Sequence, residues 1–382
     1  MMRDLMNSSV FDLKRSAIRE FAKLAKDTPG CISLTLGEPD FDTPECIREQ
    51  AKLSLDNGET HYIENNGLKE LRAAIAEYET SKHGFECTES QVIVTAGATE
   101  ALFVSLSGIL NPGDEVIIPT PAFVLYEEIV KLCRAIPVKL DTCATAFQIR
   151  KNGLESLVSE KTKAIVLNTP NNPTGTVLDT ESLEAVRQVC LEHDLFVICD
   201  DVYRKLIYTD DYHSFTEFKD VSDRTLLVQS FSKPWAMTGW RMGYLIAPDD
   251  IKERLELVHQ FMVVSTPAPF QKAAIAALEY DPVELRDTYC KRRSYMLGRL
   301  RSMGLEVPEP KGAFYMFPSI ERFGLDSATF CKRMISEVGL AATPGLCFGS
   351  DSHIRLTYCY SDSELAEGLD RLEGFIRKLE GK

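Results

Sequence analysis

The chain has 382 residues, of which 44% are hydrophobic and 26% are charged, as is usual for a globular protein with a large core. Its 57 acidic residues outnumber its 43 basic residues, and the resulting net charge of -14 argues against nucleic acid or anionic membranes as main partners. The length exceeds that of one average domain, so two domains are expected.

The cysteines and the amino terminus indicate the cellular compartment. The 11 cysteines include no Cys-x-x-Cys pair, and MMRDLMNSSVFDLKRS contains no apolar signal-peptide core. No apolar run approaches the roughly 20 residues of a membrane helix. These features favour free thiols in the cytoplasm over a disulfide framework, and no metal site is predicted.

Short apolar runs typical of buried strands alternate with helical patterns through the middle of the chain. The expected strands are VIVTA (92–96), EVIIP (115–119), AIVLN (164–168), LFVICD (195–200), TLLVQS (225–230) and GYLIA (243–247). Helical patterns such as ESLEAVRQVCLEH (181–193) lie between some of them. This alternation predicts an α/β layer with a largely parallel sheet.

After Ala247 the pattern becomes mainly helical, with helices expected over 251–264, 267–280 and 283–304. A second α+β segment follows, which contains the helix ATFCKRMISEVG and the strand HIRLTYCYS. A capping box of Ser361 and Glu364 starts the final helix. We therefore predict an amino-terminal segment that joins the small domain (1–44), a large α/β domain (45–282) and a small α+β domain (283–382).

The stretch SFSKPWAMTGWRMGY (230–244) places Lys233 directly after a buried strand. Most lysines are surface residues, but an amine kept from water has a lowered pKa and can attack a carbonyl carbon. Ser230 and Lys233 also match the S-x-x-K pattern of penicillin-binding acyl-transfer enzymes, but the chain lacks the S-D-N and K-T-G partners. A surface lysine and a nucleophile therefore remain as the two interpretations.

Two features are compatible with a bound phosphate. Arg241 carries a guanidinium that suits a phosphate, although a salt bridge is its simpler role, and Ser230 can donate to the same group. In TAGATE (95–100), a glycine at a strand-to-helix junction exposes backbone N–H groups at the positive end of a helix dipole. The motif is not G-x-G-x-x-G, so a dinucleotide site is not supported.

Polar residues follow two of the expected strands. Asp200 ends LFVIC, and Asn172 lies in the rigid turn PNNPTG (170–175) after AIVLN. Ligands of open α/β sheets bind outside the carboxyl ends of strands, so both side chains are expected in one crevice, with Tyr203 nearby. Capping of the following turn is the alternative role for Asp200.

Arg355 lies in the otherwise apolar strand HIRLTYCY, on the same face as His353 and Thr357. A buried arginine needs a partner. That partner is either a substrate carboxylate bound by two N–H groups or a structural Asp or Glu.

In their order along the chain, LGEPDFDTP (36–44), TAGATEAL, PNNPTG, CDDVY and SFSKPWAMTGWRMGY resemble the class I/II aminotransferases, which are pyridoxal-phosphate enzymes of fold type I. The similarity runs from about residue 30 to the carboxyl terminus and is greatest to the aspartate, aromatic and PatA-like branch. It implies a mostly parallel seven-stranded sheet between helices plus a smaller α+β domain. It also implies transfer of an amino group between an L-amino acid and a 2-oxo acid by a homodimer.

The resemblance assigns the cofactor-binding residues. Lys233 would hold pyridoxal phosphate covalently and act as the base, while Asp200 would pair with the ring nitrogen and Tyr203 with the phenolic oxygen. Tyr62, in YIENNGLKELR, would reach the phosphate of the neighbouring subunit. The remaining cofactor-binding residues would be Asn172 at the phenolic oxygen, Phe123 against the ring, and Ser230, Arg241, Ala98 and Thr99 at the phosphate.

The resemblance also bears on the substrate. Arg355 would bind the α-carboxylate, with Gly37 and Asn172 nearby. Many aspartate-active relatives have Trp in place of Phe123, and some have Lys in place of Thr99, so one cationic partner for an acidic side chain is missing here. Aromatic or broad neutral amino acids are therefore expected, with glutamate and 2-oxoglutarate retained as the shared pair. A carbon–sulfur lyase or decarboxylase, or a regulatory protein without turnover, remains the alternative.

Overall fold

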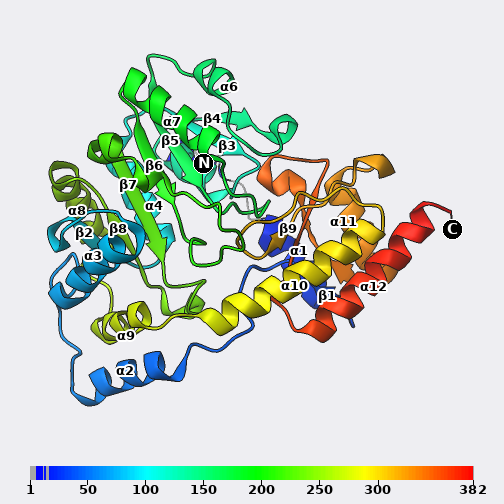
Figure 1. Ribbon diagram of the computed structural model, residues 1–382, viewed down its shortest axis with the longest axis horizontal. Coiled ribbons are helices and arrows are strands. Elements are labelled where there is room, and N and C mark those ends of the chain that lie inside the picture. The colour runs from blue at the N-terminus through cyan, green and yellow to red at the C-terminus, as the bar shows by residue number, and fades with distance from the viewer. Residues whose placement is uncertain (1–5, 12, 14–16, 382) are drawn as a thin grey trace.

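Seven strands form one sheet in the computed structural model, which describes residues 6–11, 13 and 17–381 (Figure 1). The strand order is β2-β8-β7-β6-β5-β3-β4, and only β8 runs antiparallel to its neighbours. The prediction of a mostly parallel sheet is confirmed. The strand bounds are β2 Val92–Thr95, β3 Glu115–Thr120, β4 Ile136–Asp141, β5 Thr162–Asn168, β6 Phe196–Asp200, β7 Thr225–Ser230 and β8 Gly243–Ile246.

All six strands expected from the sequence are present in this sheet, and β4 is the one that the apolar runs did not reveal. It pairs with β3 alone and lies at the edge of the sheet. Its sequence IPVKLD contains a proline and a lysine, and most of its side chains are not buried. An edge strand tolerates both residues because one side of its backbone makes no ladder hydrogen bonds.

Each face of the sheet is covered by helices, because successive strand residues point to opposite faces. In β5, Ile165 and Leu167 belong to one apolar cluster, whereas Ala164 and Val166 belong to the other. The first face packs against α2 Glu45–Asp56, α3 Lys69–His83, α7 Thr180–His193 and α9 Ala268–Glu279. The second packs against α4 Ala98–Ile109, α5 Leu125–Leu132 and α8 Asp249–Val263.

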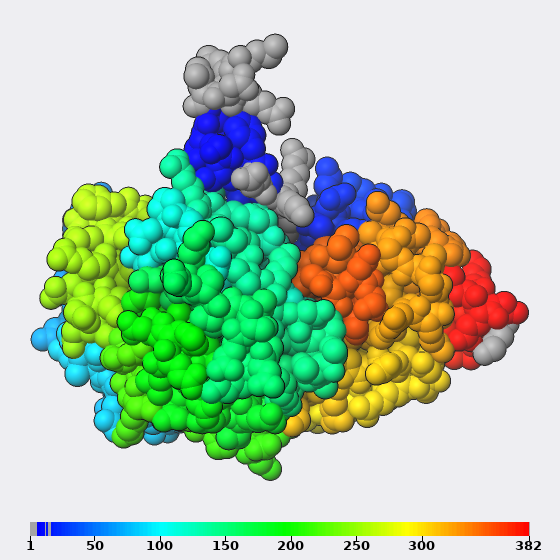
Figure 2. Space-filling model, turned by 90° about the horizontal axis from the view of Figure 1, so that it is seen from above, coloured from blue at the N-terminus to red at the C-terminus, as the bar shows by residue number. Residues whose placement is uncertain are grey.

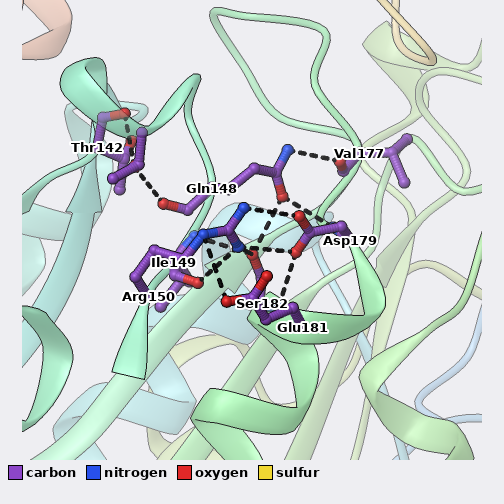
Figure 3. A network of polar contacts seen from close by, with 9 residues as sticks. Thr142, Gln148, Ile149, Arg150, Val177, Asp179, Glu181 and Ser182 are labelled. Atoms are coloured by element: carbon purple, nitrogen blue, oxygen red, sulfur yellow. Dashed lines mark hydrogen bonds and ion pairs between the residues drawn. The ribbon is translucent and has the colours of Figure 1, made fainter. Parts of the chain in front are cut away.

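The segment between β5 and α7 is fixed by polar contacts around Asp179 (Figure 3). Asp179 caps α7 by accepting from the backbone N–H of Ser182, and Arg150 binds both oxygens of its carboxylate. Gln148 accepts from the backbone N–H of Asp179 and donates to the carbonyl of Val177. These contacts hold the far end of the segment that carries Asn172.

The smaller part of the chain combines both ends of the sequence. Strand β1 Ile32–Ser33 pairs in parallel with β10 Leu340–Ala341, and β12 Ile354–Thr357 lies between β11 Thr343–Pro344 and β9 Tyr315–Met316. One apolar cluster contains Phe21 and Leu34 together with residues from 285 to 376. The helices are α1 Ala17–Asp27, α10 Val283–Ser302, α11 Ser327–Val338 and α12 Asp362–Leu379.

These contacts support our division into an amino-terminal segment (1–44), a large domain (45–282) and a small domain (283–382), which we retain as a proposal. In Figure 1 the long helix α10 runs from near α9 to the side of α12. Figure 2 shows the amino-terminal residues, in dark blue, at the boundary between the cyan-to-green and the orange-to-red parts of the molecule. The capping box of Ser361 and Glu364 is confirmed at the start of α12.

Short elements connect the larger ones. They are α6 Lys151–Glu155 and the 3-10 helices η2 Ser8–Val10, η3 Glu89–Gln91, η4 Cys143–Thr145, η5 Phe215–Glu217, η6 Lys219–Arg224, η7 Thr238–Trp240, η8 Glu321–Phe323 and η9 Gly345–Phe348. Within the described residues, every helix is too short or too polar to cross a lipid bilayer.

Candidate active site

A cavity of about 340 Å³ opens at the carboxyl ends of β5, β6 and β7, where the two parts of the chain meet. Parallel strands end at the same edge of a sheet, which is where α/β proteins bind ligands. Of the residues predicted from the sequence, those that line the cavity are Gly37, Ala98, Thr99, Phe123, Asn172, Asp200, Tyr203, Ser230, Lys233, Arg241 and Arg355. Tyr62 is the predicted site residue that does not line this cavity.

Lys233 follows β7 and lies inside the cavity rather than on the surface. Its Nζ donates to the carbonyl oxygen of Gly37 at 2.6 Å and lies 5.8 Å from the ring centre of Phe314. Burial lowers the pKa of the amine to about 8, and the positive charge of Arg355 acts in the same direction. About a tenth of the amine is therefore uncharged at pH 7, far more than for an ordinary lysine, and the neutral form is the one that a nucleophile or base requires.

Asp200 ends β6 as a buried carboxylate whose ionised form lacks a cationic partner. Its Oδ2 accepts from the hydroxyl of Tyr126 at 2.7 Å, and no Lys, Arg or His of the described residues forms an ion pair with it. Burial raises its pKa to about 7, against the effect of the Tyr126 hydrogen bond. A positively charged ligand atom would supply the missing charge.

Arg355 is almost fully buried, at 2% exposure, and its guanidinium bridges the two parts of the chain. Nη1 donates to Oδ1 of Asn172 at 2.8 Å, and Nη2 donates to the carbonyl oxygen of Thr35. In the described part of the chain, Nε has no hydrogen-bond partner and no Asp or Glu forms an ion pair with the side chain. The structural carboxylate that we weighed as its partner is therefore not found there, and the side chain retains a donor for an anion.

Two tyrosines that the sequence did not single out support these groups. Tyr126, at the start of α5, orients Asp200. The hydroxyl of Tyr315 lies 2.6 Å from that of Tyr203, and the Tyr315 ring lies 4.6 Å from the guanidinium carbon of Arg355. The position of Tyr126 three residues after Phe123 was weak evidence in the sequence that Tyr126 belongs to the site. Tyr315 could not be recognised in this way, because a tyrosine in a strand such as GAFYMF is typical of a core.

Gly37 is required by close packing. A Cβ at this position would lie 2.2 Å from the hydroxyl oxygen of Tyr315, so any larger residue would displace the ring. The glycine thus allows the backbone carbonyl that accepts from Lys233 to approach the cavity.

An anion-binding arrangement lies at the start of α4. Gly97 caps the helix with a φ of 77°, and a Cβ there would lie 2.5 Å from Nη2 of Arg241. The guanidinium of Arg241 is held by the carbonyl oxygens of Thr238 and Ala96. A cation beside the positive end of a helix dipole is compatible with a phosphate at this place, which stays a prediction.

The set of groups fits pyridoxal phosphate. An amine of lowered pKa is available for the aldehyde, a buried carboxylate without a counter-charge for the ring nitrogen, and Arg241 with the start of α4 for the phosphate. Further cavity-lining residues that the sequence did not identify are Ile18, Arg19, Leu36, Leu102, Leu125, Tyr126, Asn168, Val202, Ser232, Thr238 and Tyr315.

Known proteins resemble the chain over nearly its full length. Residues 29–372 match the family model "Aminotransferase class I and II". The probable N-acetyl-LL-diaminopimelate aminotransferase of Bacillus subtilis is 39% identical over 99% of this chain and 97% of its own. Aromatic-amino-acid aminotransferase 2 of Thermococcus litoralis is 38% identical over 95% and 96%. The crystal structure of the Thermotoga maritima aspartate aminotransferase matches with a TM-score of 0.94 at 34% identity, over 97% and 100%.

The raised pKa of Asp200 predicts that its carboxylate destabilises the cofactor-free protein. Because the folded state binds the proton more tightly than the unfolded state, stability falls as pH rises from the ordinary value of 3.8 to about 7. Asp200→Asn, in cofactor-free protein at pH 8, is expected to raise the free energy of unfolding by about 1–3 kcal/mol, measured by urea titration. The gain should disappear below about pH 4.

Asp179→Asn serves as a control of opposite sign. The pKa of Asp179 lies below its ordinary value despite burial, because Arg150 and Ser182 donate to the carboxylate. Its replacement should therefore destabilise the protein at pH 8. Equal destabilisation by both variants would contradict the description of Asp200 as a carboxylate without a counter-charge.

Proposed function

Since the chain belongs to the class I and II aminotransferases, which are pyridoxal-phosphate enzymes, we propose that the cavity around Lys233 is the site at which it transfers an amino group between an L-amino acid and a 2-oxo acid. The observation that supports this site is the presence of Lys233, Asp200 and Arg355 in one cavity, each without an ion-pair partner among the described residues. The lyase or decarboxylase alternative is not favoured, because the similar relatives are named aminotransferases.

The side chains divide the chemistry among them. Bound pyridoxal phosphate supplies the aldehyde carbon that receives the amino group and a ring that spreads the electrons left at the substrate α-carbon. The neutral amine of Lys233 would accept the α-proton and later donate a proton to the aldehyde carbon of the bound group. Asp200, oriented by Tyr126, would pair with the ring nitrogen of the bound group and keep a proton on it, and that positive charge would lower the pKa of Asp200.

Arg355 positions the substrate. The N–H groups of its guanidinium that Asn172 and Thr35 do not use bind the α-carboxylate, while those two contacts hold Nη1 and Nη2 in place. The guanidinium carbon of Arg355 lies 4.6 Å from the ring centre of Tyr315 and 4.8 Å from that of Phe348. The two rings shield the guanidinium from water and fix the plane in which it can bind a carboxylate. The α-carbon is thereby held within reach of Lys233.

The active form is proposed to be a homodimer with shared sites. Tyr62 is 90% exposed, although the loop behind it is held by hydrogen bonds to the carbonyl oxygens of Asn65 and Asn66. Next to that loop, the end of α8 exposes an apolar surface that includes Phe261, at 84% exposure, and Val264. An exposed tyrosine next to a loop that is held by hydrogen bonds, and beside exposed apolar residues, suits contact with a second copy of the chain.

The substrate range is proposed to be aromatic and broad neutral amino acids, with glutamate and 2-oxoglutarate as the dicarboxylic pair. The relatives named above act on aromatic amino acids, aspartate and N-acetyl-LL-diaminopimelate. The cavity wall formed by Ile18, Leu36 and Phe123 suits an apolar side chain. Because Thr99 carries no charge, we assign the distal carboxylate to Arg19, which lines the same wall from α1.

The role of Lys233 is tested by Lys233→Ala. The variant should lose at least about a thousandfold in the rate at which a single amino acid is converted to its 2-oxo acid, because both nucleophile and base are removed. In the wild type this half-reaction should stop after one product per site, whereas a lyase would continue to release ammonia.

Lys205→Ala is the matched control, because Lys205 is also a half-buried lysine whose pKa burial lowers, but it lies outside the cavity. Its replacement should leave the half-reaction intact. Loss of activity in both variants, or in neither, would contradict the assignment of Lys233.

The two arginines should affect different substrates. Arg19→Ala is expected to raise KM about tenfold for glutamate and 2-oxoglutarate and to leave KM for phenylalanine nearly unchanged, as loss of one ion pair implies. Arg355→Ala should raise KM for all of them. Arg19→Lys should restore part of the loss, and an equal effect of Arg19→Ala on phenylalanine would remove Arg19 from dicarboxylate binding.

Tyr62 links assembly to cofactor binding. Sedimentation should give a mass of twice 42.8 kDa, and Tyr62→Phe should raise the dissociation constant of pyridoxal phosphate several-fold without changing that mass. Tyr295→Phe, at another exposed tyrosine, should change neither quantity. A fully active monomer would exclude shared sites.

A further inference from the structure

His259 in α8 is a completely buried histidine that contacts two separate parts of the cofactor-binding machinery. Its Nδ1 lies 2.8 Å from Oε1 of Glu100, in the first turn of α4. Its Nε2 lies 2.7 Å from the carbonyl oxygen of Asn65, three residues after Tyr62. One imidazole thus joins the start of the phosphate-binding helix to the loop that carries the exposed tyrosine.

Both contacts are hydrogen bonds. A carbonyl oxygen can only accept, so Nε2 donates to Asn65. A proton then lies between Nδ1 and Glu100, whether the pair is an imidazolium with a carboxylate or a neutral ring with a carboxylic acid. In either form both ring nitrogens are used, and the orientation of the imidazole is determined by its two partners.

The contact between His259 and Glu100, here called the Glu100 arm, connects to the phosphate-binding residues through Ala96. Oε2 of Glu100 accepts from the backbone N–H of Ala96, and the carbonyl oxygen of Ala96 accepts from Arg241 at 3.3 Å. Glu100 and Arg241 therefore hold the same residue from opposite sides, directly before Gly97. The path from His259 to the anion-binding guanidinium runs through one carboxylate and one backbone residue.

The contact between His259 and the carbonyl oxygen of Asn65, here called the Asn65 arm, holds the loop that follows Tyr62. The carbonyl oxygen of the next residue, Asn66, accepts from the backbone N–H of Val94 in β2, and Glu64 pairs with Arg72 of α3. With His259, these contacts hold three consecutive residues of the loop against the large domain. His259 therefore makes one of the three contacts that hold the loop following Tyr62.

We propose that His259 is a positioning residue for the phosphate group. Through Glu100 it sets the geometry of Ala96, Gly97 and Arg241 in its own subunit, and through Asn65 it sets the position at which Tyr62 is presented to a second copy. The Glu100 arm rests on phosphate binding at the start of α4, and the Asn65 arm rests on the proposed homodimer. Loss of the imidazole is expected to weaken recognition of the phosphate more than recognition of the ring.

The test compares pyridoxal phosphate with pyridoxal, which lacks the phosphate, on cofactor-free protein. Dissociation constants are measured by absorbance, and thermal unfolding is followed in parallel. His259→Gln places an amide near Nε2 and so retains the Asn65 arm, whereas His259→Asn places one near Nδ1 and retains the Glu100 arm. His259→Gln should raise the dissociation constant of pyridoxal phosphate about tenfold and leave that of pyridoxal within about twofold.

His259→Asn tests the Asn65 arm alone, because it removes the contact with Asn65 and retains the contact with Glu100. It should reduce the additional effect of Tyr62→Phe on the affinity for pyridoxal phosphate, because the loop is then already displaced, whereas His259→Gln should leave that effect in place. Glu100→Ala, which removes both contacts of the carboxylate, provides the Glu100 test if the histidine variants fail to fold. It should raise the dissociation constant of pyridoxal phosphate and not that of pyridoxal.

Glu79→Gln is the control for stability alone. Glu79 is buried and pairs with Arg204 and Tyr244 away from the cavity, so its replacement should lower the unfolding temperature without selecting between the two ligands. Equal weakening of both ligands by His259→Gln, or a lowered unfolding temperature with unchanged affinities, would overturn the proposal. Failure of the wild type to bind pyridoxal phosphate would instead refute the proposed function.

Discussion

The site depends on charged groups that the fold buries without neutralising them. Asp200 and Arg355 are both nearly inaccessible, and neither forms an ion pair in the described part of the chain. A buried charge without a counter-charge costs several kcal/mol, so the surrounding structure must be stable enough to hold both groups in place. In the proposed function, a protonated ring nitrogen would be the cation for Asp200 and a substrate carboxylate would be the anion for Arg355.

The two charges come from different parts of the chain. Asp200 ends a strand of the large sheet, whereas Arg355 lies on β12 and reaches across to Asn172. Lys233 also spans this boundary, since its amine donates to the carbonyl oxygen of Gly37. The amino-terminal segment thus supplies an acceptor for a residue of the large domain, and any relative movement of the two parts would change both contacts at once.

Support for these groups comes from residues that do not contact a ligand through charge. Tyr126 orients Asp200, Tyr315 packs on Arg355, and Glu100 with His259 orders the start of α4. Tyr126, Tyr315 and His259 each lie on a different element from the group that they orient. Such support is what a preorganised site requires, because a side chain whose orientation is already fixed by its neighbours reorganises little when the ligand binds.

Local sequence was sufficient for features with local causes. The apolar runs predicted six strands of the large sheet because buried parallel strands are apolar along their length. The positions of Asp200 and Asn172 predicted one crevice because parallel strands end at one edge, and the resemblance to the family added Lys233. The strand β4 was not predicted because an edge strand such as IPVKLD need not be apolar.

Tertiary structure decided everything that depends on residues far apart in sequence. The partners of Arg355 could be narrowed only to a ligand or a structural carboxylate, because Asn172 and Thr35 lie 183 and 320 positions away. Arg19, Tyr126, Tyr315 and His259 looked like ordinary helix and strand residues, since nothing local to them indicates what they face. The sequence by itself thus determined the sheet and the chemical groups at its edge. Only the packing of distant segments decided which of those groups meet, because contacts between distant residues produce no periodic pattern in the sequence.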